Sequence, residues 1–122
     1  MNKAADEDRE LAARLFRAEI NADNTSVIVI PPFVYLSEFS QMQKNRGIFL
    51  GAQDSFHERD GAYTGEISAY ILHSLRVSYC LVGHSERRKD FHETDQQCLE
   101  KVQGLFNQGV TPIVCVSEEL EV

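Results

Sequence analysis

Residues 77–88 of the chain read Val77-Ser78-Tyr79-Cys80-Leu81-Val82-Gly83-His84-Ser85-Glu86-Arg87-Arg88. The apolar half of this stretch predicts a short buried strand, which a glycine ends, and polar or ionisable side chains follow at once. In parallel α/β folds ligands bind beyond the carboxyl ends of the strands, so this junction is where chemistry is expected. His84 stands at the strand end, near the start of a helical turn whose dipole disfavours imidazolium. A neutral imidazole there can donate a proton or a hydrogen bond to a developing oxyanion.

The residues after His84 allow two interpretations. In the first, Glu86 orients a neighbour or relays a proton, while Arg87 and Arg88 pair with carboxylates or with a ligand's phosphate. In the second, the run is only a polar helix start, with Ser85 as its cap and both arginines solvated. Position and composition leave both interpretations open.

The segments on either side of this junction alternate between helix and strand. Short apolar strands are predicted at residues 27–30, 48–50, 77–82 and 110–116, and helical spacing at residues 6–19, 33–44, 66–75 and 93–107. This alternation implies right-handed crossovers and a parallel sheet, either open or part of a closed barrel. The class is therefore α/β.

Three details of this pattern are specific enough to be tested. Leu11, Leu15 and Ala18 form the predicted apolar face of the first helix. The unbroken β-branched run at residues 27–30 predicts a strand covered on both faces. The polar segment at residues 53–65 is long for a connection, and loops of this length are usually functional or make contacts.

Composition limits the class of function. The 122 residues contain 12 Lys and Arg against 19 Asp and Glu, a formal net charge of −7, so no nucleic-acid or membrane-surface binding is expected. No apolar run approaches the roughly 18 residues of a membrane span. No metal site is expected, because no Cys/His cluster has metal-ligand spacing, and the glycine motifs of nucleotide binding and the serine hydrolase elbow are absent.

The cysteines indicate a reducing compartment. Cys80, Cys98 and Cys115 are odd in number, widely spaced and form no Cys-x-x-Cys pair. Cys80 and Cys115 lie in apolar runs and are most simply small buried thiols. A cytoplasmic location fits this pattern.

Several segments together resemble the triosephosphate isomerase family, in family order. They are Pro31-Pro32-Phe33-Val34-Tyr35-Leu36, Gly51-Ala52-Gln53, Gly61-Ala62-Tyr63-Thr64-Gly65-Glu66-Ile67-Ser68, Gly83-His84-Ser85-Glu86-Arg87-Arg88 and Thr111-Pro112-Ile113-Val114-Cys115-Val116. The resemblance implies a (β/α)8 TIM barrel, a fold of roughly 250 residues. Residues 1–122 would then be a single partial domain, about half of the barrel, with its second to fifth strands and the helices between them.

The resemblance also implies a reaction and its residues. The family interconverts dihydroxyacetone phosphate and glyceraldehyde 3-phosphate through an enediol, without metal or cofactor, and is a standard case of a neutral histidine electrophile paired with a glutamate base. By resemblance, His84 is that electrophile, Glu86 is a catalytic carboxylate that supports proton movement, and Ser85 lies near the substrate. The substrate would be a small phosphorylated triose.

A homodimer is implied as well. In the family, the long loop projects from one subunit into a pocket beside the partner's active site. Thr64 would contact the partner, Glu66 would pair across the interface with the partner copy of Arg87, and Gln53 would shape the interface beneath the site. Arg87 is then structural rather than phosphate-binding. Asp54 departs from the family's usual Asn at this position.

Other family groups have no counterpart among the 122 residues. The family's first strand ends in Asn-x-Lys before Met-Asn, and this chain begins Met1-Asn2-Lys3. The substrate-binding asparagine, the lysine and the catalytic glutamate are therefore not found here, and the 122 residues alone are expected to be inactive. The alternative function is a non-enzymatic half-barrel that serves as a structural or interaction module. An unrelated small α/β binding domain fits the ordered motifs poorly.

Overall fold

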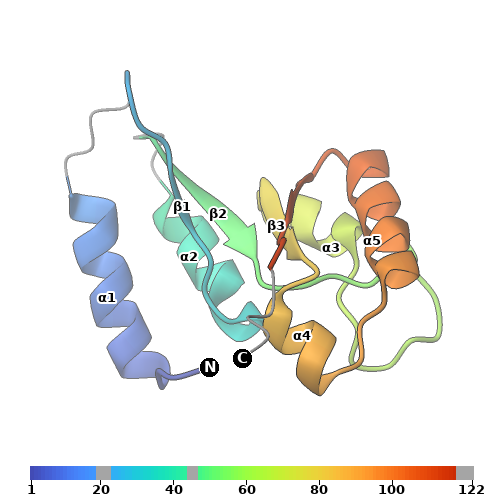
Figure 1. The fold of residues 1–122 in the computed structure, drawn as a ribbon. Helices are drawn as coiled ribbons and strands as arrows, with labels where there is room; N and C mark the ends of the chain where they lie inside the picture. Colours follow the sequence, from blue (N-terminus) through green and yellow to red (C-terminus); the bar gives the residue numbers. More distant parts are fainter. Residues whose placement is uncertain (19–22, 44–46, 118–122) are drawn as a thin grey trace.

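Four parallel strands form the sheet of the computed structural model, which describes residues 1–18, 23–43 and 47–117. The strands are β1 (Val27–Val29), β2 (Ile48–Ala52), β3 (Tyr79–Val82) and β4 (Thr111–Val114), and they lie side by side in chain order (Figure 1). Their register pairs Val29 with Leu50, Ala52 with Cys80, and Val82 with Val114. The predicted parallel α/β sheet is confirmed, and its architecture is that of part of a barrel.

One helix precedes the first strand, and the others lie in the connections between the strands. They are α1 (Ala5–Arg17), the 3-10 turn η1 (Phe33–Tyr35), α2 (Leu36–Met42), α3 (Ala69–Ser74), α4 (Ser85–Asp90) and α5 (Asp95–Asn107). α2 packs against β2, and α5 packs against β3 and β4. Of the helices in the described ranges, none has the length and apolar character needed to cross a membrane.

Several helices begin later than the sequence pattern predicts, because a side-chain cap sets the start. The helix expected from residue 66 begins at Ala69, where the hydroxyl of Ser68 accepts a hydrogen bond from the Ile71 N–H at 3.2 Å. The helix expected from residue 93 begins at Asp95, after the capping residue Thr94. Caps satisfy N–H groups that the first helical turn leaves unpaired, so they override hydrophobic periodicity at helix ends.

The predicted apolar face of α1 is wrong. The structure buries Asp8, Ala12 and Phe16, whereas Leu11 is 39% exposed. Phe16 packs edge-to-face on Phe39 of α2, with ring centroids 6.0 Å apart, and this contact sets the rotation of the helix. Helical spacing identifies two adjacent stripes here, and only the partner helix decides which one is buried.

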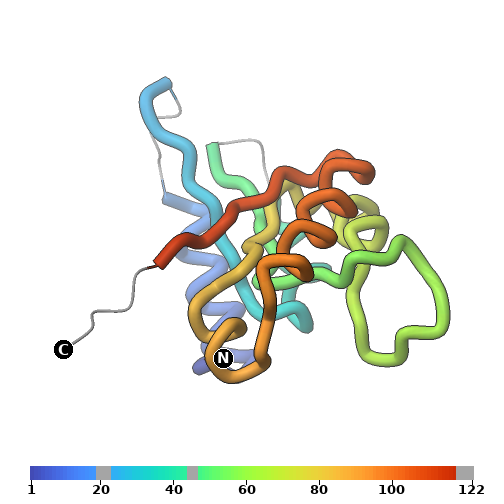
Figure 2. Tube along the Cα trace, turned by 45° about the vertical axis from the view of Figure 1, so that its right-hand side comes forward, coloured from blue at the N-terminus to red at the C-terminus, as the bar shows by residue number. Residues whose placement is uncertain are grey.

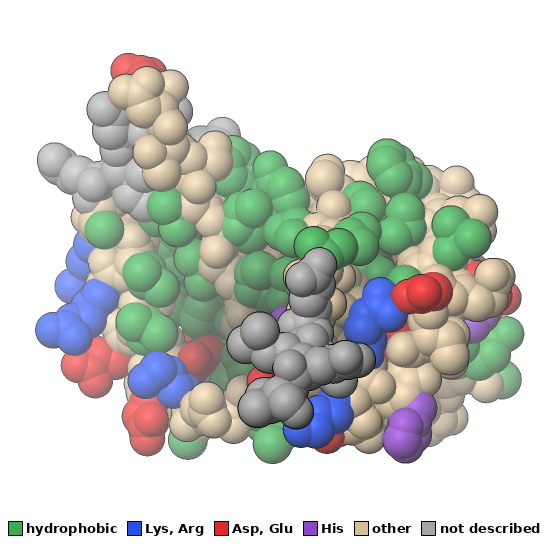
Figure 3. All heavy atoms as spheres, viewed as in Figure 1, with side chains coloured by type: hydrophobic (Ala, Val, Ile, Leu, Met, Phe, Trp, Pro, Cys, Tyr) green, Lys and Arg blue, Asp and Glu red, His purple; other side chains and the backbone are tan. Residues whose placement is uncertain are grey.

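In the described residues, only the two middle strands of the sheet have a fully buried face, and no residue of β4 is buried. In β3, Cys80 and Val82 are buried while Tyr79 and Leu81 are partly exposed, and all three residues of β1 are partly exposed. The prediction of a strand at 27–30 covered on both faces is therefore not met. Figure 3 shows hydrophobic side chains gathered over the sheet on the viewed face. The core lies between the other face and the helices; its largest fully buried side chains are Phe39, Leu36, Leu50, Leu72, Leu105, Val82, Val110 and Cys80.

The long segment after β2 projects from the body as a wide loop (Figure 2). An isolated bridge between Phe56 and Ser68 closes its base, and the Phe56 N–H donates to the Ile67 carbonyl at 2.7 Å. Inside the loop, the rings of Phe56 and Tyr63 pack 4.6 Å apart. The loop is thus held by its own contacts, which fits a contact-making role.

The three cysteines form no disulfide. Cys80 is fully buried, and burial raises the pKa of its thiol to about 12, so it is inert at neutral pH. Cys98 is also buried, but Cys115 is partly exposed because it follows β4 at the open edge of the sheet. The prediction of a buried thiol is confirmed for Cys80 and is wrong for Cys115.

Candidate active site

His84 lies directly after β3 and serves as the N-cap of α4. Its Nδ1 accepts a hydrogen bond from the Glu86 backbone N–H at 3.1 Å. An imidazole nitrogen that accepts carries no proton, so a neutral ring holds its proton on Nε2. The side chain is 40% exposed, which leaves it open to a ligand. The geometry therefore presents an Nε2–H donor beyond the carboxyl end of a strand.

The two residues after His84 point largely into solvent. Glu86 is 81% exposed on its side chain, and its Oε2 lies 3.8 Å from His84 Nδ1. These two atoms could form an ion pair only if Nδ1 carried a proton. The shorter hydrogen bond from the Glu86 backbone N–H instead places a lone pair on Nδ1. Ser85 is exposed at the first helical position. The interpretation with Ser85 as the cap is wrong, because the imidazole of His84 takes that place.

Gly83, the residue before His84, is held on both of its peptide groups. Its N–H donates to Glu93 Oε2 at 3.1 Å, and its carbonyl accepts from Arg88 Nε at 2.9 Å. Its φ of +72° is the left-handed conformation that glycine adopts most readily, and a Cβ here would lie 2.9 Å from Arg88 Nη2 and 3.0 Å from Cys98 Sγ. Conformation and crowding therefore both require glycine before the histidine.

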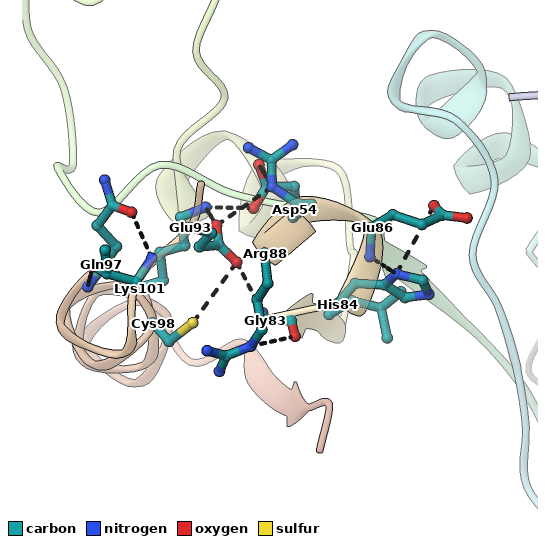
Figure 4. Close-up of polar contacts among 12 residues, drawn as sticks. Asp54, Gly83, His84, Glu86, Arg88, Glu93, Gln97, Cys98 and Lys101 are labelled. Carbon is teal, nitrogen blue, oxygen red and sulfur yellow. Dashed lines mark hydrogen bonds and ion pairs between the residues drawn. The ribbon is translucent and has the colours of Figure 1, made fainter. Parts of the chain in front are cut away.

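A cluster of four charged side chains lies beside this strand end: Asp54, Arg87, Glu93 and Lys101. Glu93 is 3% exposed and contacts Lys101 Nζ and Arg87 Nε, the latter at 3.4 Å. Asp54 completes the cluster, with Lys101 Nζ at 2.8 Å from Oδ1 and Arg87 Nε at 3.1 Å from Oδ2 (Figure 4). The cluster ties the segment after β2 to the turn after α4 and to α5.

In this cluster, the attraction between opposite charges stabilises the charged forms by more than burial destabilises them. Burial raises the pKa of Glu93, but hydrogen bonds and charge from Lys101 and Arg87 lower it by more, so its net pKa is below the usual range. Burial lowers the pKa of Lys101, but Asp54 and Glu93 raise it by more. Both groups are therefore charged across neutral pH.

The residues predicted at a subunit interface lie apart from one another. Gln53 is exposed and donates from Nε2 to the Ile30 carbonyl at 3.3 Å. Thr64 and Glu66 are exposed on the projecting loop. Arg87 is occupied within the chain by Asp54 and Glu93, and its guanidinium lies 4.9 Å from the centre of the Phe91 ring. The pairing of Glu66 with Arg87 across an interface stays a prediction.

Sequence reasoning missed the clamp on Gly83 and most of the charged cluster. The sequence pattern indicates neither Glu93 nor Lys101 as functional, and it marks Asp54 only by its departure from the family pattern. Asp54 and Lys101 are 47 positions apart, so no local spacing connects the members of the cluster. The single available signal was a charged residue, Lys101, on the inward side of an otherwise amphipathic helix. In the described part of the chain, no three His, Cys, Asp or Glu side chains are placed to hold a metal ion.

A parallel α/β sheet with a histidine just beyond a strand's carboxyl end defines the class, a barrel-type α/β protein, in which sites lie at that end of the strands. The family model for triosephosphate isomerase matches residues 1–122. This chain belongs to the triosephosphate isomerase family.

Individual relatives carry the same name. A triosephosphate isomerase of Thermoanaerobacter pseudethanolicus is 47% identical over 102 residues, covering 84% of this chain and 41% of the relative. That of Caldanaerobacter subterraneus subsp. tengcongensis is 44% identical over 120 residues, covering 98% and 48%. That of Clostridium tetani is 36% identical over 121 residues, covering 99% and 47%. The chain thus spans less than half the length of these relatives.

Proposed function

We propose that this chain contributes the electrophilic histidine of a triosephosphate isomerase site, which interconverts dihydroxyacetone phosphate and glyceraldehyde 3-phosphate. The observation that carries the proposal is the hydrogen bond from the Glu86 N–H to His84 Nδ1, because it leaves a proton on Nε2. Family membership supplies the substrate class. The site would work in the cytoplasm with no metal or cofactor, as the family resemblance implies.

In the proposed reaction, a carboxylate base removes a proton from the carbon beside the substrate carbonyl. His84 donates its Nε2 proton toward the carbonyl oxygen, so that an enediol rather than a free enediolate forms. A neutral imidazole suits this step because its acidity is closer to that of the enediol than an imidazolium's would be. Glu86, whose Oε2 is 3.8 Å from the ring, would support proton movement, and Ser85 would face the substrate.

The remaining groups of the reaction are proposed to come from outside residues 1–122. These are the asparagine, lysine and glutamate base that the family resemblance assigns. A homodimer is also proposed, with Thr64 and Glu66 on the projecting loop and Gln53 beneath the site as interface residues. Their exposure in the single chain supports this part of the proposal.

A chimera tests the role of His84. Residues 1–122 replace the matching segment of the Caldanaerobacter relative, and isomerisation is followed in both directions. We expect the chimera to be active and His84→Gln to lower kcat roughly 100- to 10,000-fold, the usual contribution of a positioned acid or base. His73→Gln, an exposed histidine on α3, serves as the matched control and should leave kcat unchanged. An active chimera that tolerates His84→Gln would refute the assignment.

The 122-residue chain by itself is expected to show no isomerisation above background. It holds the electrophile but lacks a counterpart of the family's base and lysine, and proton abstraction and charge stabilisation each contribute orders of magnitude in rate. The measurement is a coupled assay on purified chain, with His84→Gln in parallel to expose contaminating host enzyme. Activity of the pure chain that His84→Gln abolishes would contradict this expectation.

A further inference from the structure

We propose that Arg88 is a positioning residue for His84, whose side chain holds the peptide group before the histidine so that its Nε2–H keeps one direction. This inference rests on the proposed role of His84. The sequence left Arg88 solvated, paired with a carboxylate or bound to a ligand's phosphate, and the structure pairs it with the carboxylate of Asp95.

The contacts of Arg88 lie on the backbone that carries His84. Its Nε donates to the Gly83 carbonyl at 2.9 Å, and that carbonyl shares a peptide plane with the His84 nitrogen. Its own backbone N–H donates to the His84 carbonyl at 3.1 Å. The Arg88 side chain therefore holds the peptide plane before His84, while the backbone N–H groups of Arg87 and Arg88 hold the carbonyl after it. With both planes held, the ring stays where Nδ1 accepts from the Glu86 N–H.

The chemistry of the contact requires an arginine. While Nε donates to the Gly83 carbonyl (Figure 4), Nη1 donates to Asp95 Oδ1 at 2.6 Å, so the planar guanidinium spans the strand end and the first turn of α5. A guanidinium presents these donors in a fixed fork, which an ammonium group cannot reproduce. The hydrogen bond to Asp95 also raises the pKa of Arg88, so the fork stays charged.

The packing around the fork supports a positioning role rather than phosphate binding. The Arg88 side chain is only 33% exposed, and Nη2 lies 2.9 Å from the place a Cβ on Gly83 would occupy. The absence of that Cβ lets the guanidinium lie against the backbone. The contact between Arg88 and Gly83 at the end of β3 thus determines the direction in which the His84 side chain leaves the backbone.

The first test uses the chimera described above, with Arg88→Ala and Arg88→Lys. Misplacement of a catalytic group by about 1 Å can cost on the order of 100-fold, so we expect kcat to fall about 10- to 100-fold with KM changed less than about twofold. Guanidinium ion at sub-denaturing concentration should partly restore Arg88→Ala but not His84→Gln, with sodium chloride as the salt control. Lys89→Ala, an exposed cation on the same helix, is the matched control and should behave as the unsubstituted chimera.

The second test is independent of activity and uses the 122-residue chain. Nitrogen NMR of the imidazole, assigned with His84→Gln, should show the Nε2–H tautomer in the unsubstituted chain and in Lys89→Ala. Arg88→Ala should shift it toward a mixture of the two tautomers. If Arg88→Ala does not fold, Asp95→Asn takes its place. This change at an exposed site removes the carboxylate that pairs with Arg88 Nη1, and it should shift the tautomer partially.

The outcomes separate this inference from the proposed function. Arg88 variants that keep both kcat and the tautomer overturn the inference, and so does a loss of kcat with an unchanged tautomer, since Arg88 would then act elsewhere. An active chimera indifferent to His84→Gln would instead refute the proposed function. In that case the NMR comparison still decides whether Arg88 holds the ring.

Discussion

Glu93 shows how a single residue can serve both stability and the site. Its carboxylate accepts from the Gly83 N–H through Oε2, while Oε1 faces Lys101 and Arg87. Because Glu93 is nearly fully buried, loss of its charge would leave Lys101 and Arg87 with Asp54 as their shared carboxylate and would weaken the contact to the Gly83 N–H. The residue before the proposed electrophile therefore depends on a carboxylate ten positions further along the chain.

The charge of Glu93 makes the chain sensitive to acid. Its pKa in the folded state is lowered from the usual 4.5, so its contribution to the free energy of unfolding is present above pH 4.5 and is lost as pH falls through the folded value. Lys101 behaves in the opposite sense: its raised pKa contributes stability that is lost only as pH rises above 10.5. Between pH 4.5 and pH 10.5, the contribution of the cluster to the free energy of unfolding should not change with pH.

Urea unfolding across this pH range measures the effect. Glu93→Gln should lower the free energy of unfolding at pH 7 by about 1–3 kcal/mol and flatten its decline below pH 4.5. The exposed Glu10→Gln on α1 is the control, and it should change stability by less than about 0.5 kcal/mol. An acid limb as steep in Glu93→Gln as in the unsubstituted chain would show that another carboxylate controls it.

At the level of elements, α5 is the helix whose start is best defined. The Thr94 hydroxyl accepts from the Gln97 N–H at 3.2 Å, and Gln97 Oε1 accepts from the Thr94 N–H at 2.8 Å, a reciprocal capping box. The helix carries Cys98, Lys101 and Leu105 on its buried face. Its first turn therefore sets the rotation that brings Lys101 to Glu93.

Removal of this cap tests its contribution. Thr94→Ala should lower the free energy of unfolding by about 1 kcal/mol, because the Gln97 N–H loses its acceptor. The double variant Thr94→Ala with Gln97→Ala should lose less free energy of unfolding than the two single variants added together. Each single change removes one hydrogen bond of the box and also weakens the other, because the two bonds orient the same pair of residues. Thr25→Ala, an exposed threonine outside the helices, is the control. Strictly additive costs would mean that the two hydrogen bonds act independently.

For the molecule as a whole, the edges of the sheet are the exposed feature. In the described ranges, β1 and β4 each pair on one side only. Val114 on β4 is 50% exposed, and Val116 just beyond it is 91% exposed. Unpaired strand edges with apolar side chains favour pairing with another chain.

The 122-residue chain is therefore expected to self-associate, with an average mass in sedimentation equilibrium that rises with concentration. Val114→Lys should reduce this association, because a charge on an edge strand opposes edge-to-edge pairing. Leu99→Lys is the matched control: Leu99 is equally exposed but lies on the helix α5, which offers no strand edge for pairing. If both changes reduce association equally, general hydrophobic contact rather than strand pairing causes it.

The sequence by itself determined the parallel α/β class, the positions of the four strands, and His84 at a strand's carboxyl end. These are local properties, because apolar runs, glycines and the order of elements are read along the chain. The helix starts at Ala69 and Asp95 were predicted too early, since a cap depends on the geometry of a single hydrogen bond.

Tertiary structure decided which stripe of α1 is buried, which residues surround the histidine, and the protonated nitrogen of its ring. Asp54, Glu93 and Lys101 meet only because the segment after β2, the turn after α4 and α5 converge. Contacts between residues far apart in sequence arise from packing, which no local pattern encodes. The sequence placed the histidine, and the packing of the folded chain determined how it is held.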